Sequence, residues 1–252
     1  VLMFETGMFA TLWNELAVRV GIEPEFIEGD WRGGADAARI EARLREDTGH
    51  EIKAVGVVHN ETSTGATSNI ANVRAAIDAA AGAFRTWSKT TAYERSNILY
   101  RAYQLMIERS EDLAQTMTME QGKPLRAART EVKYGADFLL WFAEEAKRVY
   151  GETIPSARSD QRFIVAHQPV GVVAAITPWN YPVSMITRKV GPALAAGCTV
   201  VLKPAEATPL CAIKVFECLI DAGVPEGVIN LVTGRDPAPI GEEFVTNEKV
   251  RK

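Results

Sequence analysis

The chain contains 252 residues, of which 47% are hydrophobic and 24% are charged, and its formal net charge is −4. These values are typical of a globular protein with one large or two modest domains, and the acidic balance argues against nucleic acid as a partner. No apolar run approaches the roughly 18 residues that cross a membrane, and the initial VLMFETGMF lacks the basic region of a secretory signal. We therefore expect a cytoplasmic protein.

Strand and helix patterns alternate over residues 1–59. Apolar runs predict strands over residues 1–5, 24–29 and 52–59, and amphipathic periodicity predicts helices over 9–21 and 36–46. Alternation of this kind is typical of a doubly wound sheet. We therefore expect one piece of an α/β fold in this part of the chain.

The middle of the chain reads as almost uninterrupted helix, over residues 68–88, 92–110, 110–122 and 124–151. Ser110 followed by Glu111 and Asp112 suits a helix start, because acidic side chains stabilise a helix N-terminus. Gly122 and Gly151 suit helix ends, because glycine readily adopts the left-handed conformation found there. The sequence thus predicts a long helical region.

Strand and helix patterns return from residue 161 onwards. We predict strands over residues 162–177, 198–205 and 228–234, with helices after Pro182, over 208–223 and at the end of the chain. The three cysteines include no C-x-x-C pair and read as small buried hydrophobic residues. Neither metal-ligand spacing nor a standard phosphate-loop signature occurs, so we expect no metal site.

The stretch ITPWNYPVSM, residues 176–185, places Asn180 between two prolines. Pro178 and Pro182 fix their own φ and bias the residues before them towards extended conformations, so the chain itself aims the asparagine. A carboxamide after a buried strand lies where open α/β sheets bind ligands, and its N–H can stabilise an oxyanion. The alternative is an asparagine that caps the next helix or closes a turn.

From about Ala75 to the end, the chain resembles the N-terminal part of an aldehyde dehydrogenase of the succinate-semialdehyde type. The resemblance rests on AFRTWSKTTAYERSNIL, MEQGKPLRAARTEV, WFAEEAKRVYGETIP, the long segment from PVGVVAAITPWNYP through MITRK to VVLKPAEATP, and AGVPEGVINLVTG. It implies an incomplete Rossmann-like, doubly wound sheet with a long helical region. It also implies oxidation of an aldehyde to an acid with NAD or NADP, in a family that is usually homo-oligomeric.

The resemblance also assigns roles to residues. Asn180 matches the amide that stabilises the oxyanion. The residues that match the family's cofactor-binding positions are Ile176, Thr177, Pro178, Trp179, Lys203, Pro204, Ala205, Glu206 and Gly241. Lys203 and Glu206 match the pair that holds the adenosine ribose, although alone they would read as two solvated charges. A carboxylate there repels a 2′-phosphate, so Glu206 favours NAD over NADP.

Arg188 matches the guanidinium that binds the far carboxylate of a semialdehyde substrate, and its planar fork suits a carboxylate. The alternative is a cation that extends to the surface. The family's nucleophilic cysteine and general-base glutamate match nothing up to Lys252. We therefore expect this polypeptide to lack aldehyde oxidation.

Residues 1 to about 80 resemble a different family, the class V aminotransferases of the serine-glyoxylate or alanine-glyoxylate type. The matching segments are VLMFETGMFATLW, FIEGDW, IEARLRED, IKAVGVVHNETSTG and IANVRAAIDAA. This resemblance implies that Thr62 contacts pyridoxal phosphate (PLP), but the Schiff-base lysine that PLP chemistry needs has no match. We expect an aminotransferase-like segment over 1–72 and an aldehyde dehydrogenase segment over 73–252. The alternatives are a transaminase fragment and a non-catalytic fusion product.

Overall fold

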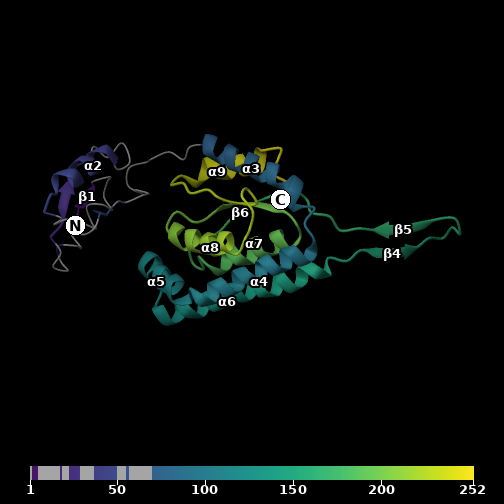
Figure 1. The fold of residues 1–252 in the computed structure, drawn as a ribbon. Helices are drawn as coiled ribbons and strands as arrows, with labels where there is room; N and C mark the ends of the chain where they lie inside the picture. Colours follow the sequence, from purple (N-terminus) through teal and green to yellow (C-terminus); the bar gives the residue numbers. More distant parts are fainter. Residues whose placement is uncertain (1, 5–17, 19–22, 29–36, 50–54, 57–69) are drawn as a thin grey trace. The chain divides into compact units, whose positions relative to one another are not determined.

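The structure is a computed structural model, and it describes residues 2–4, 18, 23–28, 37–49, 55–56 and 70–252 (Figure 1). The chain divides into two compact units, Val1–Ser68 with Gly234–Asp236, and Asn69–Thr233 with Pro237–Lys252. The predicted boundary after residue 72 falls inside helix α3 (Ile70–Trp87).

The first unit contains a small parallel sheet in the order β2-β1-β3. Strands β1 (Leu2–Phe4), β2 (Glu25–Ile27) and β3 (Val55–Gly56) lie within the three predicted strands, and α2 (Ala37–Glu46) lies within the second predicted helix. Arg43 on α2 donates to the Glu25 carboxylate on β2 at 2.8 Å, which joins helix and sheet. The first predicted helix, over 9–21, falls outside the described residues apart from Val18.

The second unit begins with α3 and three further helices, α4 (Ala92–Glu108), α5 (Ser110–Gln121) and α6 (Leu125–Glu145). A capping box starts α4: the Thr91 hydroxyl accepts from the Glu94 N–H at 3.2 Å, and the Glu94 carboxylate accepts from the Thr91 N–H at 2.7 Å. Gly122 ends α5 with a φ of 80°, as predicted. Local signals in the sequence therefore set these boundaries.

Helix α6 ends earlier than predicted. A 3-10 turn, η1 (Ala146–Arg148), follows it, and Gly151 then leads into strand β4 (Glu152–Pro155). A Cβ at Gly151 would clash with the carbonyl oxygen of Val165, so this glycine allows close strand approach and does not end the helix. Strand β5 (Arg162–Val165) pairs with β4 in an antiparallel hairpin that extends away from the helices (Figure 1).

The sequence predicted a single strand over 162–177, but the structure breaks it after β5. After β5 the chain passes Pro169, which has no N–H to donate, and Gly171, whose φ of 129° interrupts the extended backbone. Strand β6 (Val172–Ile176) starts only after this interruption. The apolar pattern alone did not reveal the break.

A second parallel sheet has the order β6-β7-β8, with β7 (Thr199–Lys203) between β6 and β8 (Ile229–Leu231). The last residues of the chain lie beside β6, because the Arg251 N–H donates to the Val172 carbonyl at 2.9 Å. Helices α7 (Ser184–Ala195), α8 (Pro209–Asp221) and α9 (Pro237–Thr246) complete the unit.

Helices cover both faces of this sheet. Successive side chains of a strand point to opposite faces, so Val201 packs in one apolar cluster while Val200 and Leu202 pack in another. The Val201 cluster draws on α3 and α9, and the Val200 cluster draws on α4 to α8 together with Trp87 at the end of α3. Figure 1 shows α3 and α9 on one side of β6, and α7 and α8 on the other. The predicted fold class, a doubly wound sheet with a long helical region, is confirmed.

Candidate functional site

Strands β6 and β7 end at the same edge of the sheet. Their last residues, Ile176 and Lys203, are partners in parallel register, and the Thr177 N–H donates to the Lys203 carbonyl at 3.1 Å. Open α/β sheets bind ligands in the crevice beyond such strand ends. The Asn180 turn, defined as residues 177–183, and the KPAE segment, residues 203–206, therefore start side by side.

Main-chain contacts hold the Asn180 turn against the end of α5. The Gln121 amide donates to the carbonyl oxygens of Trp179 at 2.9 Å and Asn180 at 3.1 Å. The Lys123 ammonium donates to the same Asn180 carbonyl at 2.9 Å and lies 4.3 Å from the centroid of the Tyr181 ring. The backbone at Asn180 is thus fixed by two side chains from outside the turn.

The Asn180 side chain has a different environment. The residue is exposed, and its carboxamide makes no hydrogen bond with any residue that the structure describes. Helix α7 has Val183 as its N-cap, without a side-chain cap. Asn180 therefore does not cap this helix, whereas the other alternative, an asparagine that closes a turn, stays a prediction.

Glu131 on α6 supplies the acceptor that α7 needs at its start. One carboxylate oxygen accepts from the N–H groups of Val183 at 3.0 Å and Ser184 at 3.2 Å, and the other pairs with the Lys123 ammonium. The sequence predicted a helix after Pro182. The helix begins at Ser184, where these N–H groups meet the carboxylate. Sequence reasoning missed Glu131, because a glutamate in an amphipathic helix usually faces solvent.

Lys203 is 1% exposed although it carries a charge. Its ammonium donates to the Pro204 carbonyl at 2.9 Å and pairs with the carboxylate of Glu206. The Glu206 side chain is 30% exposed, so the pair has a buried end and an accessible end. An ammonium has three N–H groups, and the described residues engage two of them. The accessible Glu206 carboxylate can therefore accept hydrogen bonds from a ligand at this edge of the sheet.

The other predicted cofactor positions differ in exposure. Ile176, Pro178 and Trp179 are exposed, whereas Thr177, Pro204 and Ala205 are buried. Gly241 lies inside α9, and a Cβ added there would meet no atom within 4 Å. The exposed positions are available to a ligand, while the buried ones shape the backbone beneath them.

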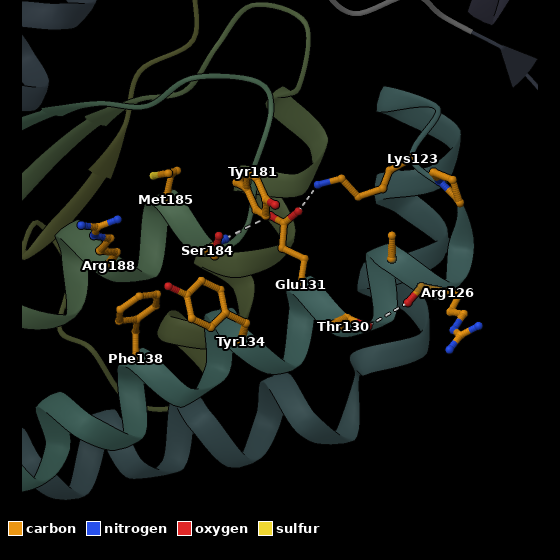
Figure 2. A pocket seen from close by; sticks show the side chains of 12 residues that line it. Lys123, Arg126, Thr130, Glu131, Tyr134, Phe138, Tyr181, Ser184, Met185 and Arg188 are labelled. Carbon is orange, nitrogen blue, oxygen red and sulfur yellow. Dashed lines mark hydrogen bonds and ion pairs between the residues drawn. The ribbon is translucent and has the colours of Figure 1, made fainter.

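A cavity of about 800 Å³ lies between α6 and α7, beside the Asn180 turn (Figure 2). Its walls include the aromatic rings of Tyr134, Phe138 and Tyr181 and the side chain of Met185. Figure 2 shows the guanidinium groups of Arg188 and Arg126 at opposite ends of the view. Lys123 and Glu131 also line the cavity and pair with each other, which leaves the two guanidinium groups for a ligand. A largely apolar cavity with two such groups suits a small organic anion.

The cysteines have none of the features of a nucleophile. Cys198, Cys211 and Cys218 are all buried. Burial raises the pKa of the Cys211 thiol, and the adjacent Glu120 carboxylate raises it further. Burial also raises the pKa of Cys218. A nucleophilic cysteine needs a lowered pKa, which Cys211 and Cys218 lack. The burial of all three thiols agrees with the prediction that they are small buried residues.

Within the described ranges, no three His, Cys, Asp or Glu side chains gather around a point where a metal could bind. In the same ranges no helix has the length and apolar character to cross a bilayer. Thr62, the predicted PLP contact, falls outside the described residues.

The sequence model of the aldehyde dehydrogenase family matches residues 47–252, and so begins before residue 73, where we expected that segment to start. The chain is 58% identical over 179 residues to the NADP(+) succinate-semialdehyde dehydrogenase of Escherichia coli, covering 71% of this chain and 37% of that protein. It is 49% identical over 228 residues to the glutarate-semialdehyde dehydrogenase of Pseudomonas putida, covering 90% of this chain and 45% of that protein.

The fold agrees with these sequence matches. The crystal structure of succinate-semialdehyde dehydrogenase from Burkholderia pseudomallei superposes with a TM-score of 0.71 and 52% identity, over 72% of this chain and 38% of that chain. The chain spans less than half the length of each of these relatives. On the family match and these identities, the chain belongs to the aldehyde dehydrogenase family.

Proposed function

We propose that residues 73–252 form part of the cofactor-binding and substrate-binding region of a semialdehyde dehydrogenase. The observation that carries this proposal is the position of the Asn180 turn between two features. Its first residue pairs with Lys203 at the sheet edge, and Tyr181 lines the cavity that also contains Arg188. A dinucleotide on one side and an aldehyde on the other would therefore meet near the exposed Asn180 carboxamide.

Lys203 and Glu206 are the proposed contacts to the adenosine ribose. The buried ammonium donates to ribose oxygens, and the more exposed carboxylate accepts from ribose hydroxyls. The family uses NAD or NADP, which accepts the hydride when it is bound. The name of the E. coli relative specifies NADP(+), whereas the Glu206 carboxylate disfavours a 2′-phosphate. We propose NAD for this chain.

Asn180 is the proposed donor to the alkoxide that forms when a nucleophile attacks the aldehyde. An oxyanion donor has to be free to donate to the ligand, and the Asn180 carboxamide is exposed on a backbone that Gln121 and Lys123 anchor. Arg188 is the proposed contact to a distal carboxylate, in line with the semialdehydes in the names of the relatives. The proposed substrate class is therefore a short aldehyde that ends in a carboxylate.

We further propose that a polypeptide of these 252 residues does not oxidise aldehydes by itself. None of its three cysteines matches the family's nucleophile motif, and all three are buried. Formation of NADH from succinate semialdehyde by the purified chain would refute this part of the proposal.

Titrations of intrinsic fluorescence with NAD and with PLP test the proposal. Saturable quenching by NAD, without a response to PLP, is the expected result. Saturable binding of PLP alone would support the transaminase-fragment hypothesis for residues 1–72. If neither ligand binds, the non-catalytic fusion product becomes the better explanation.

Family membership is also the basis for proposing a homo-oligomer in the cytoplasm. Light scattering coupled to size exclusion tests the assembly, and a mass above one chain of 27.6 kDa is the expected result. A monomer across the accessible concentration range would contradict it.

A further inference from the structure

We infer that Lys123 and Glu131 are positioning residues for Asn180, because their buried ion pair fixes the turn that presents its carboxamide. The inference rests on the proposed function, in which Asn180 donates to an alkoxide. It concerns two residues that line the cavity beside the Asn180 turn but contact neither the ribose pair nor, by their charged atoms, the Asn180 carboxamide itself.

The ion pair bridges both sides of Pro182. The Glu131 side chain is 1% exposed and the Lys123 side chain 14% exposed. Glu131 accepts from the N–H groups of Val183 and Ser184, which follow the proline. Lys123 donates at 2.9 Å to the carbonyl oxygen of Asn180, which precedes it. A rotation of the turn would have to break contacts at both ends.

Stability alone does not account for this arrangement. Removal of two charges from water costs about as much as their attraction returns, so a buried ion pair contributes little net stability. The pair does fix the orientation of the turn. Lys123 holds the Asn180 carbonyl, and Glu131 holds the N–H groups at the start of α7. The Asn180 carboxamide itself has no hydrogen-bond partner among the described residues, so the anchored backbone sets the point from which this side chain extends.

Residues at the end of α5 also hold the start of α8. Glu120 accepts from the N–H group of Cys211 at 3.0 Å, at the start of α8, just beyond the KPAE segment. Gln121 holds the carbonyls of Trp179 and Asn180. The EQGKP segment, residues 120–124, thus contacts the turn that follows β6 and the start of α8, and Lys123 is its contact to the buried Glu131.

The test compares Lys123→Met with Lys133→Met, a matched change at an exposed lysine of α6. Residue-specific amide hydrogen exchange by NMR reads out the N–H groups of Val183 and Ser184. We expect exchange at these two groups to be at least about tenfold faster in Lys123→Met, because the carboxylate that accepts from them loses its anchor. Lys123→Arg keeps a cationic donor and should restore exchange to within about threefold of the parent chain.

The double variant Lys123→Met/Glu131→Gln covers the case in which the single variant fails to fold. It leaves no unpaired buried charge, and the new amide oxygen can still accept from Val183 and Ser184. We expect the side-chain amide of Asn180 and the indole of Trp179 to shift in its spectrum, since the donor to the Asn180 carbonyl is gone.

The inference would be overturned if amide exchange at Val183 and Ser184 and the chemical shifts of Trp179 and Asn180 did not change. This holds whether or not the melting temperature falls, because the pair would then act only on general stability. An NAD titration on the same samples separates the two proposals. Failure of the parent chain to bind NAD counts against the proposed function, whereas the exchange data decide the role of the pair.

Discussion

Glu206 pairs with the ammonium of Lys203, but the two side chains differ sharply in exposure, at 30% and 2%. A ligand that approaches the sheet edge therefore meets the carboxylate before the ammonium. The charge of Glu206 is consequently well placed to choose between a ribose hydroxyl and a ribose phosphate.

Glu206→Gln should shift the cofactor preference towards NADP by about tenfold. The change removes a negative charge near the 2′-position, and one charge at close range contributes on the order of 1 to 4 kcal/mol at the protein surface. Titrations with NAD and NADP measure the ratio of the two dissociation constants. Glu226→Gln, at an exposed site before β8, is the control. Equal changes in both constants would count against a contact between Glu206 and the ribose.

Asn180→Ala should leave the free energy of unfolding within about 0.5 kcal/mol of the parent value, because the carboxamide has no partner among the described residues. Thr91→Ala is the contrasting variant. Its side chain completes a capping box, and its loss should cost about 1 kcal/mol. Urea denaturation measures both. A cost at Asn180 as large as that at Thr91 would revive the structural role that the sequence left open.

Several boundaries were predictable because short segments determine them. The capping box at Thr91 and the left-handed Gly122 act on their own turns, so α4 and α5 appear where the sequence indicated. Strand β7 and the end of β6 were predictable for a similar reason, since a run of β-branched and small apolar residues suits a sheet covered on both faces.

The burial of Glu131 was not predictable, because it depends on packing between distant segments. A Cβ at Gly135 would lie 3.0 Å from Val183, so this glycine lets α6 and α7 approach closely and places the carboxylate beside the start of α7. The β4–β5 hairpin was missed for the opposite reason. Its strands are exposed, and their alternation is too short to stand out.

Arg188→Met should weaken binding of a short dicarboxylate such as succinate by at least about tenfold. A charge-assisted contact from a guanidinium contributes roughly 1.5 to 3 kcal/mol, and methionine keeps the apolar part of the cavity wall. Lys189→Met is the control, because Lys189 is the next residue, is exposed and does not line the cavity. Isothermal titration calorimetry gives the affinities. Equal affinity for succinate in the two variants would show that Arg188 is a surface cation that does not contact the ligand.

All three thiols should react slowly with a disulfide reagent in the folded chain and rapidly in denaturant. Each is buried, and the raised pKa of Cys211 and of Cys218 lowers the fraction of thiolate that can react. The release of thionitrobenzoate at neutral pH, with and without guanidinium, measures the difference. One thiol that reacts at once without denaturant would show that a cysteine is accessible as a nucleophile.

Acid should weaken the contact between α5 and α6 through Glu111. Hydrogen bonds from Arg129, and then from Gln115, lower the pKa of this carboxyl from 4.5 to about 2. A folded-state pKa below the unfolded value means that the unfolded chain binds the proton more readily. The contribution of Glu111 to stability is therefore complete above about pH 4.5 and is lost as the pH falls towards 2.

Glu111→Gln should consequently flatten the fall in stability across this pH window and leave the rest of the curve unchanged. Because both partners are about half exposed, 1 M salt should reduce the difference from the parent chain. Thermal unfolding at half-unit pH steps measures the slopes. Glu108→Gln is the control, since Glu108 is exposed and forms no ion pair within the described ranges. If both variants give the parent slope, the Arg129 contact does not persist in solution.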